Sequence, residues 1–278
     1  MSDQGVEYES QIVLGDSRKV LQGFPDKKFH CCITSPPYWG LRDYGIDGQI
    51  GSEFDIENYI KDIVMIFREV RRTLRDDGTL WLNIGDSYTS GGRTWRDEDK
   101  KNPGRGMSYR PPTPNGLKPK DLIGVPWKVA FALQSDGWFL RSDIIWNKPN
   151  CQPESVRDRP TRSHEFVFLF SKSEKYYYDC DAIMEPSAEG KLKNRRSVWN
   201  INTNGFKGAH FAVFPPELVK YCMLAGTEKG GLVLDPFFGS GTVGLVANSL
   251  NRKYLGIELN PEYIKLADER LKLQPQFF

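Results

Sequence analysis

The sequence lacks the features of several large protein classes. Its 278 residues include only five cysteines and three histidines, and the cysteines show no CxxC spacing. An odd number of cysteines without CxxC spacing argues against a disulfide framework or a metal site and is typical of a reducing compartment. No run approaches the roughly 18 apolar residues that a membrane span needs. The polar N-terminus is unlike a signal or transit peptide, so we expect a cytoplasmic protein with no membrane partner.

A large charge excess is also missing. The formal net charge is +2, from 38 basic and 36 acidic residues, and so small an excess indicates no partner by itself. Hydrophobic residues make up 39% of the chain and charged residues 27%, which is enough apolar material for a packed core. The length suits one sizeable domain, and we predict a single domain over residues 1–278.

Strand-like and helix-like segments alternate along the chain, which predicts an α/β sheet. Strands are predicted at 11–14, 30–34, 79–84, 140–147, 165–171, 232–234 and 254–257. Apolar residues at helical spacing predict a helix from 56 to 74, capped by Asp55 and ended by Asp77-Gly78. Further helices are predicted at 122–135, 216–225, 242–250 and 261–273.

Two stretches interrupt this alternation, at 88–120 and 186–210. Both concentrate Lys and Arg, and both interleave aromatic residues, such as Trp95 and Trp199, among the charges. Basic loops with aromatic residues predict a nucleic-acid surface, while the alternative is a pair of solvated surface loops. Loops this long are uncommon in a compact domain unless they are functional, which favours the first interpretation.

A stiff loop follows the predicted strand 30–34. Ser35-Pro36-Pro37-Tyr38 contains two prolines, which hold φ near about −65° and remove two backbone donors. Residues before proline are pushed towards extended conformations, so the carbonyl oxygens of this loop remain able to accept hydrogen bonds from a ligand. Ser35 adds a side-chain acceptor and Tyr38 a flat apolar face. The pattern favours a planar ligand with an amino group; the alternative is an ordinary turn after a strand.

A second motif lies between the predicted strand 232–234 and the predicted helix 242–250. It reads Asp235-Pro236-Phe237-Phe238-Gly239-Ser240-Gly241-Thr242. Glycines after a strand let the backbone pass close to a ligand, and the helix that follows offers unpaired N–H groups. Glu258 ends the next predicted strand, where an acidic residue usually holds ribose hydroxyls. The motif is neither a P-loop nor a full GxGxxG, so it indicates a nucleoside without a pyrophosphate.

Together these motifs resemble those of the amino-group DNA methyltransferases that use S-adenosylmethionine. Ser35 to Tyr38 match the family's catalytic motif (D/N/S)PP(Y/F/W), and Asp235 to Thr242 match its cofactor motif DPFxGxGT. The catalytic motif comes first in the chain, which is similar to the order in the group called β. Further similarity at Gly15-Asp16-Ser17, 144–149, 162–165 and 210–218 extends the resemblance over most of residues 11–271.

The resemblance implies an α/β, Rossmann-like class I methyltransferase fold with a circularly permuted motif order. The sheet should be twisted, mainly parallel and seven-stranded, with helices on both faces. The implied catalytic residues are Ser35, Pro36, Pro37 and Tyr38. The implied residues for S-adenosylmethionine are Asp16, Phe214, Asp235, Phe237, Phe238, Gly239, Ser240, Gly241, Thr242 and Glu258. Among these, Asp16 would bind the adenine.

The chemistry of the acceptor indicates what the loop does in such an enzyme. A base amino nitrogen is a poor nucleophile because its lone pair is delocalised into the ring. Hydrogen bonds from its two hydrogens to Ser35 and to the Pro36 carbonyl would favour a tetrahedral nitrogen whose lone pair points outward. The base must first leave the duplex, and Tyr38 would then stack on it. No cysteine nucleophile is required, so Cys31 and Cys32 are predicted to be core residues.

In the resembled family, inserted segments such as 88–120 and 186–210 carry target recognition. The basic residues expected to contact duplex DNA are Arg93, Arg96, Lys100, Lys101, Arg105, Arg195 and Arg196. A cognate restriction endonuclease and a homodimer are compatible with the resemblance. Members that begin the motif with Thr-Ser, as Thr34-Ser35 does, usually modify cytosine at N(4), whereas those that begin with Asp usually modify adenine at N(6). We favour cytosine; adenine, an RNA methyltransferase and a non-catalytic nucleic-acid-binding module are the alternatives.

Overall fold

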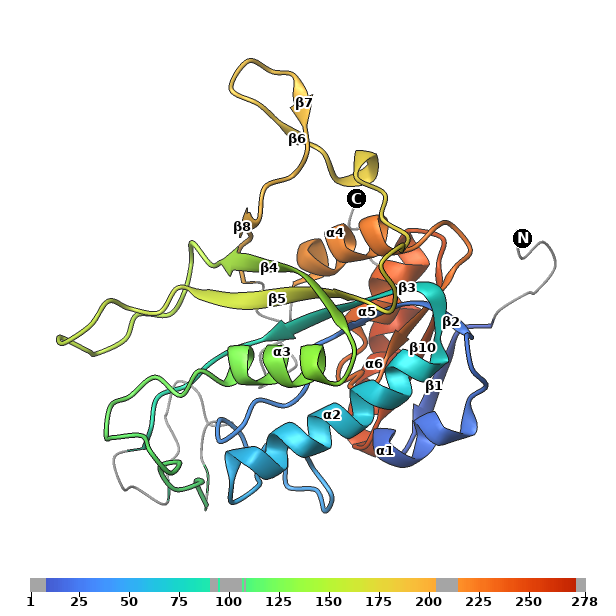
Figure 1. The fold of residues 1–278 in the computed structure, drawn as a ribbon. Coiled ribbons are helices and arrows are strands. Elements are labelled where there is room, and N and C mark those ends of the chain that lie inside the picture. The colour runs from blue at the N-terminus through green and yellow to red at the C-terminus, as the bar shows by residue number, and fades with distance from the viewer. Residues whose placement is uncertain (1–8, 91–94, 96–106, 108, 204–214, 274–278) are drawn as a thin grey trace.

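The structure is a computed structural model that describes residues 9–90, 95, 107, 109–203 and 215–273. A central sheet of eight strands runs through it, with the order β1-β10-β9-β2-β3-β5-β4-β8 (Figure 1). The strands are β1 (Gln11–Leu14), β2 (Phe29–Thr34), β3 (Leu74–Ile84), β4 (Phe139–Asn147), β5 (His164–Ser171), β8 (Val198–Asn200), β9 (Leu232–Asp235) and β10 (Lys253–Glu258). The neighbours from β1 to β3 are parallel, and β5 is antiparallel to both β3 and β4.

The seven predicted strands are all present, and the sheet is mainly parallel as expected. The difference is β8, an eighth strand that pairs with β4 inside the segment predicted to be a recognition loop. Trp199 explains why this strand docks. Its side chain is buried, and its ring lies against the rings of Trp81 and Tyr221, with centroids 6.4 and 5.7 Å apart. Trp199 is therefore a core residue rather than part of a nucleic-acid surface.

Helices cover both faces of the sheet (Figure 1). The helices α1 (Ser17–Val20), α2 (Ile56–Thr73) and α3 (Val125–Ser135) lie on one face, and α4 (Pro216–Gly226), α5 (Thr242–Ser249) and α6 (Pro261–Lys272) on the other. Successive strand residues point to opposite faces, so Cys32 joins the first core and Cys31 the second. Both cysteines are fully buried, which confirms their predicted place in the core.

The end of α2 differs from the prediction. The helix ends at Thr73, because Leu74 is already extended, with φ −71° and ψ 145°, and is buried in the core. Leu74 pairs with Phe29, and the next pair along the ladder joins Thr79 to Cys31, so residues 75–78 form a bulge. Asp77 and Gly78 therefore lie within an irregular strand, and the helix passes into the sheet without a separate turn.

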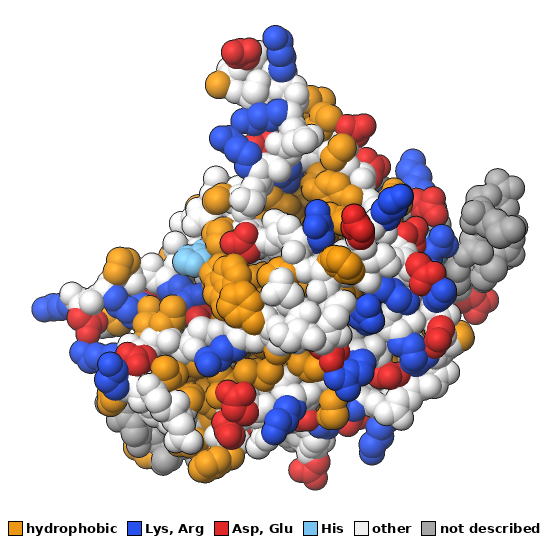
Figure 2. All heavy atoms as spheres, viewed as in Figure 1, with side chains coloured by type: hydrophobic (Ala, Val, Ile, Leu, Met, Phe, Trp, Pro, Cys, Tyr) orange, Lys and Arg blue, Asp and Glu red, His pale blue; other side chains and the backbone are white. Residues whose placement is uncertain are grey.

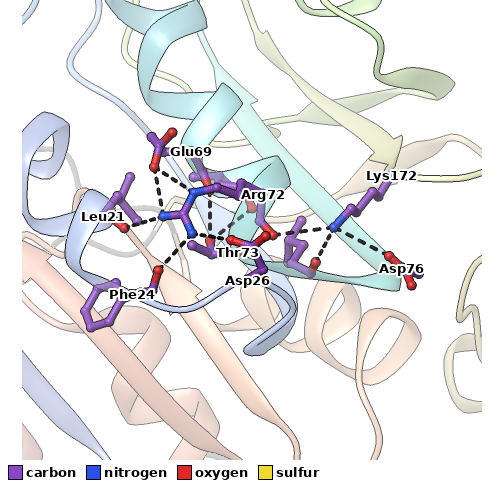
Figure 3. A network of polar contacts seen from close by, with 10 residues as sticks. Leu21, Phe24, Asp26, Glu69, Arg72, Thr73, Asp76 and Lys172 are labelled. Atoms are coloured by element: carbon purple, nitrogen blue, oxygen red, sulfur yellow. Dashed lines mark hydrogen bonds and ion pairs between the residues drawn. The ribbon is translucent and has the colours of Figure 1, made fainter.

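A polar network holds this junction, at the end of the sheet where β3 begins (Figure 3). The Arg72 guanidinium donates to the carbonyls of Leu21 and Phe24 at 3.0 and 2.8 Å and pairs with Asp26 and Glu69. Nearby, Lys172 Nζ donates to the Leu74 carbonyl at 2.7 Å. These contacts tie α2 and β3 to the turn after α1, far from the strand ends that carry the motifs.

Arg72→Met should therefore destabilise the fold. The variant keeps much of the apolar stem but leaves the Leu21 and Phe24 carbonyls without their donor, so we expect a loss of about 1–3 kcal/mol of unfolding free energy. Denaturant unfolding followed by circular dichroism measures this change. Arg68→Met, at an exposed arginine that pairs with Asp136, is the matched control and should have a much smaller effect.

Candidate active site

The strand order brings the sequence motifs together at one edge of the sheet. Parallel strands end at the same edge, and β1, β10, β9, β2 and β3 are consecutive neighbours. Their carboxyl ends carry Asp16, Glu258, Asp235, Ser35 and Gly85 in that order. Residues that are far apart in the chain thus form one continuous row, at the place where open α/β sheets bind ligands.

The two principal motifs are joined by a direct hydrogen bond. Thr34, the last residue of β2, donates through Oγ1 to Asp235 Oδ1 at 2.7 Å, and the backbone N–H of Phe237 donates to the same oxygen at 3.1 Å. Asp235 is almost fully buried. Burial raises the pKa of its carboxyl group to about 7, although these hydrogen bonds act in the opposite direction.

Glu258 holds the glycine-rich loop that follows β9. Its carboxylate accepts from the backbone N–H of Gly239 at 2.7 Å and of Asn260 at 2.8 Å, while burial raises the pKa of Glu258 above its ordinary value. Gly239 and Gly241 have φ of 51° and 78°, which favour glycine. A Cβ built on Gly239 would have its nearest neighbour at 4.0 Å, so a ligand can approach the backbone closely there.

Phe238 does not line this site. Its ring is 3% exposed, stacks on Tyr254 with centroids 5.5 Å apart, and fills the space beside Gly244 and Gly256. The loop turns this ring into the core, so the predicted place of Phe238 at the cofactor stays a prediction that concerns its backbone rather than its ring. Ser240 and Thr242 point towards Arg270, whose Nη1 lies 3.0 and 2.9 Å from their hydroxyl oxygens. These side chains shape the loop from behind.

Asp16 caps the short helix α1 and is engaged by its neighbour. Its carboxylate accepts from the backbone N–H of Arg18 at 2.9 Å and pairs with the Arg18 guanidinium, which also donates to the Gly48 carbonyl. Partial burial would raise the pKa of Asp16, but the hydrogen bonds from Arg18 outweigh it and the pKa is lowered. Ser17 then donates to the Pro236 carbonyl, which ties the end of β1 to the loop after β9. Phe214 lies outside the described residues.

The loop after β2 is held from several sides. Tyr59 donates to the Pro37 carbonyl at 3.0 Å. The ring of Tyr38 lies against Gly85, where a Cβ would come within 2.6 Å of Tyr38 Cε2, so this close approach requires glycine. The Tyr38 hydroxyl lies 3.3 Å from Ser35 Oγ and donates to Glu165 Oε2 at 2.7 Å. The serine and tyrosine of the motif are thus linked to a carboxylate on β5.

Three residues of this arrangement were not assigned a role from the sequence. Glu165 forms an ion pair with Lys148 and accepts from Asn83 Nδ2 at 3.2 Å. Lys148 directly follows β4, and Glu165 is the second residue of β5, the antiparallel neighbour of β4. Both are charged residues next to an apolar strand segment. That transition is the sequence signal that could have identified them, but it does not show which loop they face.

Asp86, which follows Gly85 after the end of β3, has a structural role. Its carboxylate accepts from the backbone N–H of Gly124 and of Val125, both at 3.0 Å, and it therefore caps the start of α3. Arg162 lies at 3.8 Å from the same carboxylate. The residue joins the end of β3 to the first turn of α3.

Two of the seven basic residues expected to contact DNA lie in the described part of the chain. Arg195 donates to the Ile183 carbonyl at 2.8 Å, and its guanidinium lies 3.7 Å from the centroid of the Tyr221 ring; Arg196 pairs with Glu185 at 2.9 Å. Both hold the hairpin of β6 (Glu185–Pro186) and β7 (Leu192–Lys193), which projects beside α4 with Lys, Arg and acidic side chains interspersed (Figures 1 and 2). Arg93, Arg96, Lys100, Lys101 and Arg105 lie outside the described residues.

Within the described ranges, no group of three or more His, Cys, Asp or Glu residues is placed to hold a metal ion. No helix in the same part of the chain is long and apolar enough to cross a bilayer.

Comparison with known proteins places the chain among DNA methylases. A family model described as DNA methylase, of the N6/N4 type, matches residues 29–269. The chain is 68% identical to the Type II methyltransferase M.SmaI of Serratia marcescens, over 94% of this chain and 90% of the relative. It is 63% identical to M.XycI of Xanthomonas campestris pv. cyanopsidis, over 95% and 88%.

Solved structures share the fold. The chain of the PvuII DNA methyltransferase, described as cytosine-N4-specific, matches with a TM-score of 0.71 at 23% identity, over 95% of this chain and 87% of that one. The Thermus thermophilus protein TTHA0409, solved with S-adenosyl-L-methionine, matches with a TM-score of 0.65 at 24% identity, over 97% and 96%. These likenesses confirm the expected class I methyltransferase architecture.

The raised pKa of Asp235 predicts a specific pH dependence of stability. Between about pH 4 and pH 7 the folded protein keeps a proton on Asp235 that the unfolded chain has released, so this group's contribution falls as the pH rises through that range. Asp235→Asn stays neutral and can still accept from Thr34. At pH 8 the variant should be more stable than the wild type by up to about 4 kcal/mol.

Chemical denaturation at intervals from pH 5 to pH 8 measures this effect. The wild-type stability should fall more steeply with pH than that of Asp235→Asn, and Asp47→Asn, at an exposed carboxylate, is the control substitution. Parallel curves for the wild type and Asp235→Asn would show that Asp235 is ionised throughout and would contradict the prediction.

Proposed function

Since the chain belongs to the N6/N4 DNA methylase family, we propose that it transfers a methyl group from S-adenosylmethionine to the exocyclic N4 amine of a flipped-out cytosine at a specific site in duplex DNA. The coarser activity, DNA methylation, is that of the family. The observation that carries the proposal is the 2.7 Å hydrogen bond between Thr34 and Asp235. It holds the loop that would receive the target amine directly beside the loop that would hold the methyl donor.

The residues at the ends of β1, β9 and β10 fit S-adenosylmethionine. This cofactor supplies a methyl group that its positively charged sulfur has already activated. The open space over Gly239 admits a ligand to the backbone, and the Glu258 carboxylate beside it would accept from ribose hydroxyls. Asp235 would organise the loop near the methionine end. An adenine amine at Asp16 would share the carboxylate with Arg18.

Ser35 and the Pro36 carbonyl would accept the two hydrogens of the target amine. This arrangement turns the nitrogen lone pair outward, and positioning then supplies much of the rate enhancement. A serine is a neutral acceptor, whereas an aspartate at the same place would be charged. We favour cytosine on the Thr34-Ser35 start of the motif, with adenine N6 as the alternative, because a serine hydroxyl can accept from either amine.

The basic segments would hold the DNA. Phosphate contacts from residues such as Lys100 and Lys101 would position the duplex, and a smaller set of arginines would read base edges. Arg195 would contribute by linking the segment 186–210 to α4 through the Tyr221 ring, and Arg196 by pairing with Glu185 of β6. A cognate restriction endonuclease and a second copy of the chain remain expectations from the sequence.

The product identifies the target base. Purified protein is incubated with S-adenosylmethionine and unmethylated duplex DNA, and the digested DNA is examined by mass spectrometry. We expect N4-methylcytosine, and little product from Ser35→Ala under the same conditions. Detection of N6-methyladenine instead would identify adenine as the target base. Methyl groups found only on RNA or protein, in parallel incubations, would contradict the proposal.

Glu258→Ala should weaken the binding of S-adenosylmethionine. The variant loses the charge-assisted hydrogen bonds to ribose and also the acceptor that holds the Gly239 N–H, so we expect a loss of about 1–3 kcal/mol of binding free energy. Calorimetric titration measures the affinity. Glu262→Ala, at an exposed carboxylate in the first turn of α6, is the control and should bind as the wild type does. Unchanged affinity in folded Glu258→Ala would remove this residue from the site.

A further inference from the structure

A chain of hydrogen bonds leads from the motif serine to a charged pair on the neighbouring strands. Ser35 Oγ lies 3.3 Å from the Tyr38 hydroxyl, which lies 2.7 Å from Glu165 Oε2. The other oxygen of Glu165 pairs with Lys148 Nζ. The side chains of Lys148 and Glu165 are only 17% and 19% exposed, so the pair is largely withdrawn from water.

The charge of Glu165 sets the direction of this chain. Burial alone would raise the pKa of Glu165, but the ammonium group of Lys148 and the hydrogen bonds from Lys148, Tyr38 and Asn83 outweigh it and lower the pKa. At neutral pH the carboxylate can therefore only accept. The Tyr38 hydroxyl donates to Glu165 Oε2 at 2.7 Å, the shorter of its contacts with two acceptors, since Asn83 Oδ1 lies at 3.3 Å. Its phenol oxygen is then left to accept from Ser35. The Ser35 hydroxyl proton points back into the protein.

A fixed direction matters for the chemistry proposed above. A free serine hydroxyl can either accept from the target amine or donate to its nitrogen. Donation would occupy the lone pair that has to attack the methyl group. A serine whose hydroxyl already donates a hydrogen bond to Tyr38 offers only its oxygen lone pairs to the target amine. An aspartate at this position would be an acceptor by itself. A serine acts only as an acceptor when a partner accepts the hydrogen bond from its hydroxyl.

On the basis of the proposed function, we propose that Glu165 is a positioning residue that makes Ser35 an obligate hydrogen-bond acceptor for the amine of the target base. It acts through Tyr38 and touches neither the base nor the cofactor. Lys148 keeps Glu165 ionised and so preserves the direction of the hydrogen bonds from Ser35 through Tyr38 to Glu165. Lys148 is itself held 4.2 Å from the centroid of the Trp146 ring, which places its ammonium group beside the carboxylate.

Glu165→Gln tests the direction of the chain with little change in shape. The amide can donate to the Tyr38 oxygen, so the Tyr38 proton can turn to Ser35 or to Asn83 Oδ1, and the Ser35 hydroxyl loses its fixed orientation. We expect the single-turnover rate of methyl transfer to duplex DNA to fall by about tenfold or more, which is about 1.4 kcal/mol in the barrier. The affinity for S-adenosylmethionine, measured by calorimetry, should change by less than about twofold. Glu174→Gln, at an exposed residue beyond the other end of β5, is the matched control.

A double-mutant cycle separates this route from a general structural effect. Tyr38→Phe cuts the chain, so it should lower the transfer rate while keeping the aromatic ring. Glu165→Gln added to Tyr38→Phe should then cause no further loss, because the connection to Ser35 is already broken. Equal losses from Glu165→Gln in the wild-type and Tyr38→Phe backgrounds would overturn the proposal.

A pH profile gives a reading that a structural role would not produce. The groups that face Glu165 are Lys148, Tyr38 and Asn83, with His164 close enough to interact electrostatically. Lys148→Met removes the positive charge, so burial should raise the pKa of Glu165. Once protonated, Glu165 becomes able to donate. As the pH is lowered, the transfer rate of Lys148→Met should therefore begin to fall at a higher pH than that of the wild type. This displaced acid limb should be absent from Lys148→Met combined with Tyr38→Phe.

The outcomes distinguish a failure of the proposed function from a failure of the role of Glu165. Wild-type protein that transfers no methyl group to DNA would contradict the proposed function itself. Active wild-type protein together with a wild-type rate in Glu165→Gln would overturn only the role of Glu165. If Glu165→Gln fails to fold, which thermal melting and cofactor binding reveal, the pH profile of Lys148→Met decides: an acid limb unchanged from the wild type would overturn the proposal.

Discussion

The parallel pairing of β2 with β9 is the constraint on which the site depends. The pairing joins Cys31 to Val233 and Cys32 to Leu234 and therefore brings the ends of the two strands together. There Thr34 and Asp235, 201 residues apart in the chain, form a buried hydrogen bond. In the proposed function, this pair fixes the loop that would receive the target amine relative to the loop that would hold the methyl donor. Positioning of this kind is the main contribution a protein can make when the donor is already activated.

Three carboxylates near this edge experience different electrostatic surroundings. Burial raises the pKa of Asp235 and of Glu258, and neither has a cationic partner within the described contacts that opposes the shift. Glu165 is also withdrawn from water, but Lys148 lowers its pKa. The carboxylates of Asp235 and Glu258 are held mainly by backbone N–H groups and a hydroxyl, whereas Glu165, behind the loop after β2, pairs with an ammonium group. This ion pair fits the proposed role of Glu165 in orienting hydrogen bonds.

The glycine-rich loop takes its shape from the core behind it as much as from its own glycines. Phe238 enters the space beside Gly244 and Gly256, and Arg270 contacts the hydroxyls of Ser240 and Thr242. Glu258 holds the Gly239 N–H from the neighbouring strand. The backbone that would approach a cofactor is therefore fixed from three directions. A side chain that belongs to a binding motif can thus act by positioning the backbone and never face the ligand.

Local patterns in the sequence predicted the seven strand segments, most of the helices and the two loops at strand ends, because periodicity, proline stiffness and glycine turns are local properties of the chain. The packing of the folded chain was needed to show that α2 ends at Thr73, that Trp199 and Phe238 are core residues, and that Arg195 and Arg196 hold a hairpin. Packing also brings Glu165 to Tyr38 across 127 residues of sequence. Such partners depend on which strands lie side by side, and strand order follows from the summed packing of both faces of the sheet, which no local pattern records.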